Sequence, residues 1–270
     1  MPSIVSVILI ALAAGVVGTT LGGVLGIIVK KPKKGYIGGM LAFAAGAMLG
    51  MALFEMLPEA YEHGAEIFSG GGLVAVLVGL ALGCLFVFGF NLLINRKKDE
   101  SAQLDGAELA GGVGEDSEKI EKRDKRKFLS VGIAVFIAII LHDLPEGIAI
   151  GAGYHVGLAF TLGIVMLLHN IPEGLAIAVP LKASGMHNVK IIGLTFAAGI
   201  PTLLGAILGY FIGMNDFLIA YTLSFAAGVM MYIVFSEMLP TAYEYNKKHH
   251  ITTLCIVLGA VVMIVFSSLI

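Results

Sequence analysis

Two near-copies of one six-residue motif carry the side chains that are best suited to bind a metal ion. They read HDLPEG at residues 142–147 and HNIPEG at residues 169–174, 27 residues further on. In each copy a histidine and a glutamate four residues apart share one face of a helix. The proline between them has no N–H and leaves a carbonyl oxygen of the preceding turn without its helical partner, so that this oxygen could bind an ion or water. Imidazole and carboxylate together are typical ligands of divalent transition metals.

The elements that must position these motifs are membrane-spanning helices. Of the 270 residues, 58% are hydrophobic and 13% are charged, and the mean hydropathy is +0.95. These values exclude a soluble globular domain. Eight apolar segments reach the roughly 20 residues that a helix needs to cross a bilayer. They cover approximately residues 4–29, 36–62, 72–95, 128–153, 157–182, 190–213, 217–245 and 251–270. Because lipid offers backbone groups no partner and the alternation of barrel strands is absent, we expect an all-α polytopic membrane bundle.

The positive charges predict how these spans are oriented. If the N-terminus is placed outside, all 17 lysines and arginines fall in inner loops, at residues 30–34, 96–127, 182–190 and 247–248. Basic loops stay in the cytoplasm, so both termini are expected to be extracellular or periplasmic in a multi-pass protein of the cell membrane.

The polar stretch in the middle of the chain divides it into three regions. We expect transmembrane helices 1–3 in residues 1–95, a disordered cytoplasmic loop in residues 96–127, and transmembrane helices 4–8 in residues 128–270. The composition of the loop, rich in charged residues, glycine, serine and alanine, is typical of a linker. The two helical regions are predicted to form one integrated membrane domain.

An internal repeat relates the two halves of the chain. The segment from Leu41 to Glu62 recurs from Leu223 to Glu244 at a constant offset of 182 residues. In the topology above, the second and seventh spans run in opposite directions, as do the fourth and fifth, which carry the motifs. We therefore expect inverted repeats in which helices 1–3 are related to helices 6–8 and helix 4 to helix 5. Such repeats are typical of carriers that expose a site near the bilayer midplane to each side in turn.

The acidic side chains of the motifs need a positive partner at that depth. Each ionised carboxylate at the bilayer centre costs about 2.5–3.5 kcal/mol on insertion scales. In the predicted topology no lysine or arginine lies at the same depth in the membrane. The adjacent histidines favour a transition metal over sodium or calcium. The predicted primary ligands form a tetrahedral set that suits zinc, namely His142, Glu146, His169 and Glu173. Asp143 and Asn170 could hold a second ion, or the same ion in another state.

At this point the chain resembles the ZIP (Zrt/Irt-like) divalent metal transporters, nearest the GufA-like group. The resemblance rests on the duplicated motif, the eight spans, the outward termini and the polar loop after the third span, and it covers essentially the whole chain. It implies zinc import into the cytoplasm, often broadened to iron, manganese or cadmium, a homodimer, and no prosthetic group. It also implies a binuclear centre formed by His142, Asp143, Glu146, His169, Asn170 and Glu173.

One position departs from the family pattern. Related proteins place a glutamate of the sixth helix beside the second ion. Here the helix expected over Lys190 to Gly213 contains no acidic residue, and Thr202 stands near the expected place.

Other polar residues are candidates for the transport path or have no predicted metal role. Glu55 and its repeat copy Glu237 each precede a proline by one turn, and Glu59 lies in an acidic outer helix end that could concentrate cations. The alternative is that these are solvated carboxylates at helix ends. Cys84 and Cys255 are isolated and are predicted to be packing residues. The net charge of −2 argues against a nucleic-acid partner.

Two other functions remain open from the residues alone. A membrane-embedded zinc metallohydrolase would use the same histidines to hold a catalytic zinc with an open position for water. A metal-responsive receptor or assembly factor would bind the ion without moving it. The inverted pair of motif-bearing helices favours transport, so we predict a carrier rather than an enzyme.

Overall fold

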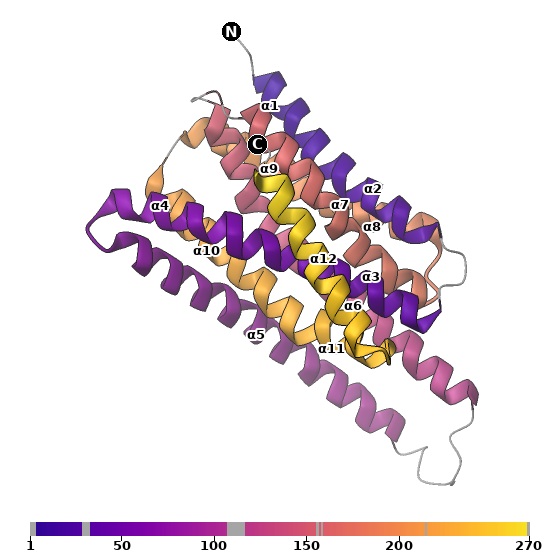
Figure 1. Ribbon diagram of the computed structural model, residues 1–270. Helices are drawn as coiled ribbons and strands as arrows, with labels where there is room; N and C mark the ends of the chain where they lie inside the picture. Colours follow the sequence, from indigo (N-terminus) through magenta and orange to yellow (C-terminus); the bar gives the residue numbers. More distant parts are fainter. Residues whose placement is uncertain are drawn as a thin grey trace.

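Helices form every regular element in the described part of the computed structural model, which covers residues 4–28, 33–106, 117–154, 157, 159–213 and 215–268. Eight helical stretches in this part are long and apolar enough to cross a membrane, which confirms the all-α polytopic prediction. They comprise residues Ile4–Ile27, Lys34–Ile67, Gly71–Gly89, Glu121–Gly153, Ala159–Ala183, Asn188–Ile212, Asp216–Tyr245 and His249–Ser268. Figure 1 shows that α1 begins and α12 ends toward the same end of the bundle.

Several spans consist of more than one helical segment. The described elements are α1 (Ile4–Ala11), η1 (Leu12–Val17), α2 (Gly18–Ile27), α3 (Lys34–Met51), η2 (Ala52–Met56), α4 (Leu57–Ile67), α5 (Gly71–Gly106), α6 (Ser117–Gly153), α7 (Ala159–Ala183), α8 (Asn188–Ala198), α9 (Ile200–Ile212), α10 (Asp216–Ile233), η4 (Val234–Met238), α11 (Leu239–Tyr245) and α12 (His249–Ser268). The η segments are π-helical turns, which widen the helix locally and are frequent at functional sites.

Two of the π-helical segments occupy matching positions of the sequence repeat. Glu55 lies in η2 and Glu237 lies in η4, and each segment precedes a proline, Pro58 or Pro240. A proline lacks the N–H that would bond the carbonyl four residues earlier, so the regular helical ladder is interrupted there. Each widened turn therefore carries an acidic residue at the same place in its span.

The predicted linker is helical at both of its ends. Helix α5 continues as far as Gly106 and α6 begins at Ser117, so regular structure enters the range 96–127 from either side. Residues 107–116 lie outside the described residues. The disordered state and cytoplasmic location of the loop stay predictions.

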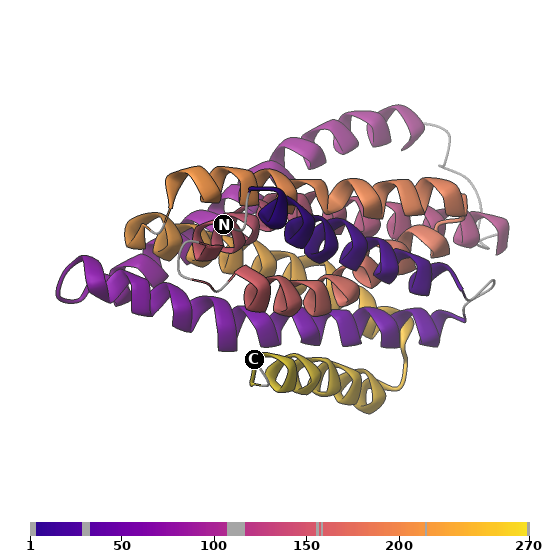
Figure 2. The ribbon, with the colours of Figure 1, turned by 90° about the horizontal axis from the view of Figure 1, so that it is seen from above.

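The helices pack in pairs around the two that carry the motifs. Helix α6 packs against α7 and α9, α2 against α7, α3 against α12, and α10 against α5. Figure 2 shows the helices running side by side along a common direction, with α12 at one edge. Under the predicted relation between the two halves, the pair α2–α7 corresponds to α9–α6, and α3–α12 corresponds to α10–α5. The packing is consistent with the predicted repeat.

Glycines bring the backbones of these pairs into contact. A Cβ at Gly147 of α6 would lie 2.1 Å from the Thr202 carbonyl oxygen of α9, and one at Gly174 of α7 would lie 2.0 Å from the Thr19 carbonyl oxygen of α2. Only glycine fits at such a distance, and small residues are the usual means of close helix packing in membranes. The final glycine of each motif therefore fixes that motif against a neighbouring helix.

Substitution of one such glycine is expected to destabilise the bundle. A Cβ at Gly46 of α3 would lie 1.9 Å from the Ile256 carbonyl oxygen of α12, so Gly46→Ala forces the two backbones apart. We expect Gly46→Ala to lower the free energy of unfolding by about 1–3 kcal/mol, the usual cost of overpacking, seen as a lower Tm of the purified protein in detergent. In Gly193→Ala, where the new Cβ meets nothing within 4 Å, the Tm should stay the same or rise slightly. Equal Tm values for both variants would contradict the packing described here.

Candidate metal centre

The two motifs lie on α6 and α7, and the bundle buries both. Helix α6 provides His142, Asp143 and Glu146, and α7 provides His169, Asn170 and Glu173. None of these six residues is more than 2% exposed. Ionisable side chains buried to this extent within spans are rare and normally mark a functional site.

The histidine of each motif pairs with the glutamate of the other motif. His142 Nε2 lies 2.9 Å from Glu173 Oε1, and His169 Nε2 lies 2.9 Å from Glu146 Oε2. Within one motif the corresponding contact is longer, since His142 Nε2 is 4.0 Å from Glu146 Oε1. The site is therefore formed between α6 and α7, and neither helix holds it alone.

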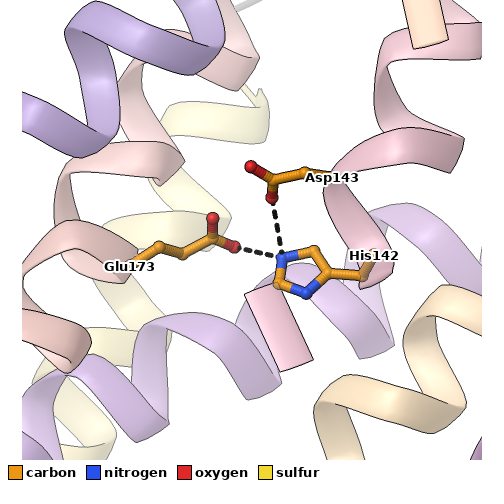
Figure 3. Close-up of side chains that lie close together, drawn as sticks. All are labelled: His142, Asp143 and Glu173. Atoms are coloured by element: carbon orange, nitrogen blue, oxygen red, sulfur yellow. Dashed lines mark hydrogen bonds and ion pairs between the residues drawn. The ribbon is translucent and has the colours of Figure 1, made fainter. Parts of the chain in front are cut away.

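The surroundings of the His142 ring require a positive species at Nε2. His142 Nδ1 lies 3.0 Å from the Ala138 carbonyl oxygen, which can only accept a hydrogen bond, so Nδ1 carries a proton. A neutral imidazole then has a lone pair at Nε2, directed at oxygens of Glu173 (2.9 Å) and Asp143 (3.3 Å), as Figure 3 shows. A lone pair facing carboxylates is unfavourable unless a proton or a metal ion lies between them. The tautomer with Nε2 deprotonated is the one that binds metals.

The side chains form two groups of potential ligands that share one carboxylate. His142, Asp143 and Glu173 form one group, and Glu146, His169 and Glu173 form the other, and the ligand atoms within each group lie within 4.8 Å of one another. Nitrogen and carboxylate oxygen ligands in this number suit zinc and similar divalent metals. The structure thus brings together five of the six predicted metal ligands, with Glu173 between the two groups.

Several polar atoms at the centre have no hydrogen-bond partner in the described part of the chain. They are Asp143 Oδ1, Glu146 Oε1, His169 Nδ1, Asn170 Oδ1 and Glu173 Oε2. Buried polar atoms are normally hydrogen-bonded, and leaving them unpaired is costly. The described ion pairs of the three carboxylates involve only histidines. This agrees with the predicted topology, in which no lysine or arginine lies at the same depth in the membrane. A cation would pair with these oxygens.

The residues that follow the two histidines differ in their partners. Thr202 of α9 donates a hydrogen bond from Oγ1 to Asp143 Oδ2 at 3.2 Å. Asn170 donates from Nδ2 to the carbonyl oxygen of Ala14 in η1 at 2.9 Å, and its Oδ1 is left as an acceptor. The sequence indicated Thr202 only through the departure from the family pattern. It gave no signal for the Ala14 carbonyl, because a backbone acceptor has no residue-type signature.

The predicted path residues lie at different distances from the centre. Glu55, whose Oε2 is buried without a hydrogen-bond partner, is close enough to His169 and Glu146 for electrostatic interaction. Glu59, one turn further along, interacts with Glu55 and His63. Glu237 occupies the matching place in η4 and is partly buried. Glu59 thus interacts with Glu55, and Glu55 interacts with two residues of the centre.

These observations define a polytopic helical membrane protein with a buried histidine and carboxylate centre between two of its spans. The chain matches the model of the ZIP zinc transporter family over residues 95–267, and it belongs to that family. It is 32% identical to the zinc transporter ZupT of Clostridium perfringens over 98% of this chain and 96% of that protein. Two further ZupT zinc transporters, from Corynebacterium glutamicum (91% of this chain, 92% of that protein) and Streptococcus mutans (96% and 94%), are each 31% identical.

The family decides between the functions that the sequence left open. Its members are transporters and not enzymes, so the metallohydrolase alternative has no support. Family membership also confirms the resemblance to the ZIP transporters, while the placement nearest the GufA-like group stays a prediction.

The hydrogen bond from Thr202 to Asp143 provides a test of the geometry at the centre. Thr202→Val keeps the shape of the side chain against Gly15 but removes the donor, which leaves Asp143 Oδ2 unpaired. We expect a loss of about 1–3 kcal/mol in the free energy of unfolding, the usual cost of an unsatisfied buried acceptor, measured by thermal unfolding without added metal. Thr202→Ser keeps the hydroxyl and should retain most of the stability. A valine variant as stable as the parent would show that this hydrogen bond is absent.

Proposed function

We propose that this protein carries zinc across a membrane through the buried centre between α6 and α7. The crossed pairing of His142 with Glu173 and of His169 with Glu146 is the observation that carries the proposal. Each pair sets an imidazole nitrogen against a carboxylate, no lysine or arginine is buried beside them among the described residues, and a divalent cation satisfies both groups. The relatives named as zinc transporters support zinc as the substrate. Iron, manganese and cadmium are further candidates, because their ligand preferences overlap with those of zinc.

The ion ligands that we propose are those of both motifs. His142, Glu146, His169 and Glu173 serve as primary ligands, and Asp143 and Asn170 contribute to a second position. Asp143 lies with His142 and Glu173 in one of the two groups of potential ligands. The unpaired oxygens of Asp143, Asn170 and Glu173 support this assignment. The metal is the cargo, so the ligands must release it as well as bind it.

Alternating access and an inward direction of transport are part of the proposal. The matched packing of α2–α7 with α9–α6, and of α3–α12 with α10–α5, supports an inverted repeat. In the predicted topology all 17 basic residues lie on one side of the membrane, which supports termini outside, a cytoplasmic 96–127 segment and a place in the cell membrane. On this topology Glu59 and Glu55 form the outer part of the path and Glu237 the inner part. A homodimer is proposed on the family resemblance.

Loss of either motif glutamate should abolish transport. In sealed proteoliposomes that contain the purified protein and a zinc indicator, we expect zinc flux in Glu146→Ala and Glu173→Ala to fall to the level of empty liposomes. Each substitution also leaves a buried histidine without its partner. Glu121→Ala, which removes an exposed carboxylate paired with Lys125, is the matched control and should keep full flux.

Zinc binding by the same variants separates a carrier from a receptor. Titration calorimetry should show zinc affinity in the parent protein and a loss of about tenfold or more in both glutamate variants, the usual effect of removing a metal ligand or its partner. Tight binding by the parent without any flux would contradict transport and favour a metal-responsive receptor. Unchanged flux in both variants would place the path elsewhere.

Neutralisation of Glu55 should slow transport at low zinc without removing the centre. Glu55→Gln keeps the size of the side chain but removes the negative charge beside His169 and Glu146. We expect flux at low zinc to fall roughly threefold to tenfold, because acidic groups in a path raise the local cation concentration. Saturating zinc should restore most of the rate. Glu66→Gln, which alters an exposed carboxylate of the same span, should have no such effect. Equal behaviour of the two variants would exclude a path through Glu55.

A further inference from the structure

A basic pocket lies at the end of the bundle where α3, α6 and α12 begin. It has a volume of about 700 Å³, and its wall consists of residues 33–36, 123–124, 244–248 and Ile251. These segments are far apart in the sequence, and the fold gathers them around one open cavity. We call it the inner pocket, because the proposed orientation places this end of the bundle in the cytoplasm.

Positive charge dominates the inner pocket. Five basic residues and two acidic residues line it. Both carboxylates already have partners, since Asp124 accepts hydrogen bonds from Lys34 (2.5 Å) and the Tyr245 hydroxyl (2.9 Å), and Glu244 pairs with Lys127. Within the described residues, no ion pair involves Lys33, Lys247 or Lys248. The described residues therefore leave surplus positive charge in the pocket.

The backbone adds to this positive potential. Helices α3 and α12 both direct their N-termini toward the pocket, and the N-cap residue of α3, Lys33, makes no side-chain capping bond. The first N–H groups of a helix and its macrodipole favour an anion. With the lysines that precede each helix, they form a donor set that suits a phosphoryl group.

The remaining wall is apolar and aromatic. Tyr36 and Ile251 are exposed, and the Tyr245 ring lies 5.6 Å from Lys34 Nζ. The pocket lies where three spans begin, at the level expected for lipid headgroups, where tyrosine is enriched. A soluble anion would make no contact with this apolar wall, whereas the glycerol and acyl portion of a phospholipid would pack against it.

We propose that the inner pocket binds the phosphate group of an anionic phospholipid. Basic pockets between membrane helices on the cytoplasmic side suit anionic headgroups. The shared chemistry is a phosphoryl anion held by Lys33, Lys247 and Lys248, and the lipid is its source. The wall of the inner pocket includes Arg123 and Asp124 of α6 as well as the first residues of α3 and the residues before α12, so a lipid there would lie beside the helix that carries His142. The assignment rests on the proposed orientation.

The test measures binding directly, without zinc flux. Native mass spectrometry of the full chain in detergent, with added phosphatidylglycerol or phosphatidylcholine, counts the lipids that each form retains. The test variant is Lys247→Gln/Lys248→Gln, and the matched control is Lys125→Gln/Lys190→Gln, which removes the same charge outside the pocket. Lys247→Arg/Lys248→Arg keeps the charge and reports on folding. A parallel arm adds inorganic phosphate and measures the shift in Tm.

We expect the parent, the control and the arginine variant to retain one phosphatidylglycerol in preference to phosphatidylcholine. The glutamine test variant should bind it about tenfold or more weakly, since each lysine near an anionic headgroup contributes to binding. A Tm increase with inorganic phosphate that depends on Lys247 and Lys248, without a preference for phosphatidylglycerol, would establish the anion site but overturn the lipid as its source. Equal retention of both lipids by all forms, with no effect of phosphate, would overturn the proposal. Failure of zinc flux would leave these readouts unaffected.

Discussion

The structure depends on one constraint, which is that carboxylates and imidazoles are buried together and that no lysine or arginine is buried with them in the described part of the chain. His142 donates from Nδ1 to a backbone carbonyl, so its other nitrogen faces Glu173 with a lone pair. Two electron-rich atoms at 2.9 Å are stable only when a positive species lies between them. A positive species would likewise stabilise the oxygens of Asp143, Glu146 and Glu173 that have no hydrogen-bond partner among the described residues. The described protein groups therefore leave buried oxygens at the centre without a hydrogen-bond partner, which suits the proposed role of binding a cation and releasing it.

The rest of the bundle keeps these groups in position despite their mutual repulsion. The glycine that ends each motif allows α6 to contact α9 and α7 to contact α2 at backbone distance. In addition, a Cβ at Gly205 would lie 2.2 Å from the Leu144 carbonyl oxygen, and one at Gly22 would lie 2.1 Å from the Ile171 carbonyl oxygen. These contacts hold the proline-containing turns of both motifs, so the polar groups are supported by close packing rather than by ion pairs with lysine or arginine.

Much of the centre was predictable because metal ligands have recognisable residue types. The spacing of His142 and Glu146 correctly indicated a shared helix face. The burial of all six motif residues agrees with their predicted position near the middle of their spans. The pairing was not predictable. A histidine and glutamate four residues apart extend from one helix in similar directions, and the closer partner of His142 is Glu173 on the facing helix. Facing side chains depend on the crossing of α6 and α7, which the sequence of either helix alone does not determine. The spans were likewise predictable from hydropathy, whereas the helical turns of α5 and α6 within 96–127 consist of polar residues that hydropathy assigns to a loop.

The two motifs have matched backbone surroundings but different chemistry. The carbonyl oxygen of Thr202 lies against Gly147, and the carbonyl oxygen of Thr19 lies against Gly174. A Cβ placed on Gly147 or Gly174 would be 2.1 or 2.0 Å, respectively, from that oxygen. The Asp143 carboxylate accepts a hydrogen bond from the Thr202 hydroxyl, whereas the Asn170 amide donates one to the Ala14 carbonyl oxygen. The Thr19 hydroxyl, which has no acid to bond, donates instead to the Gly15 carbonyl of its own helix. A single difference between aspartate and asparagine thus accounts for the different partners of two equivalent threonines. It also places the extra negative charge of the centre on the side of α6, where Asp143 joins His142 and Glu173 around one ligand group.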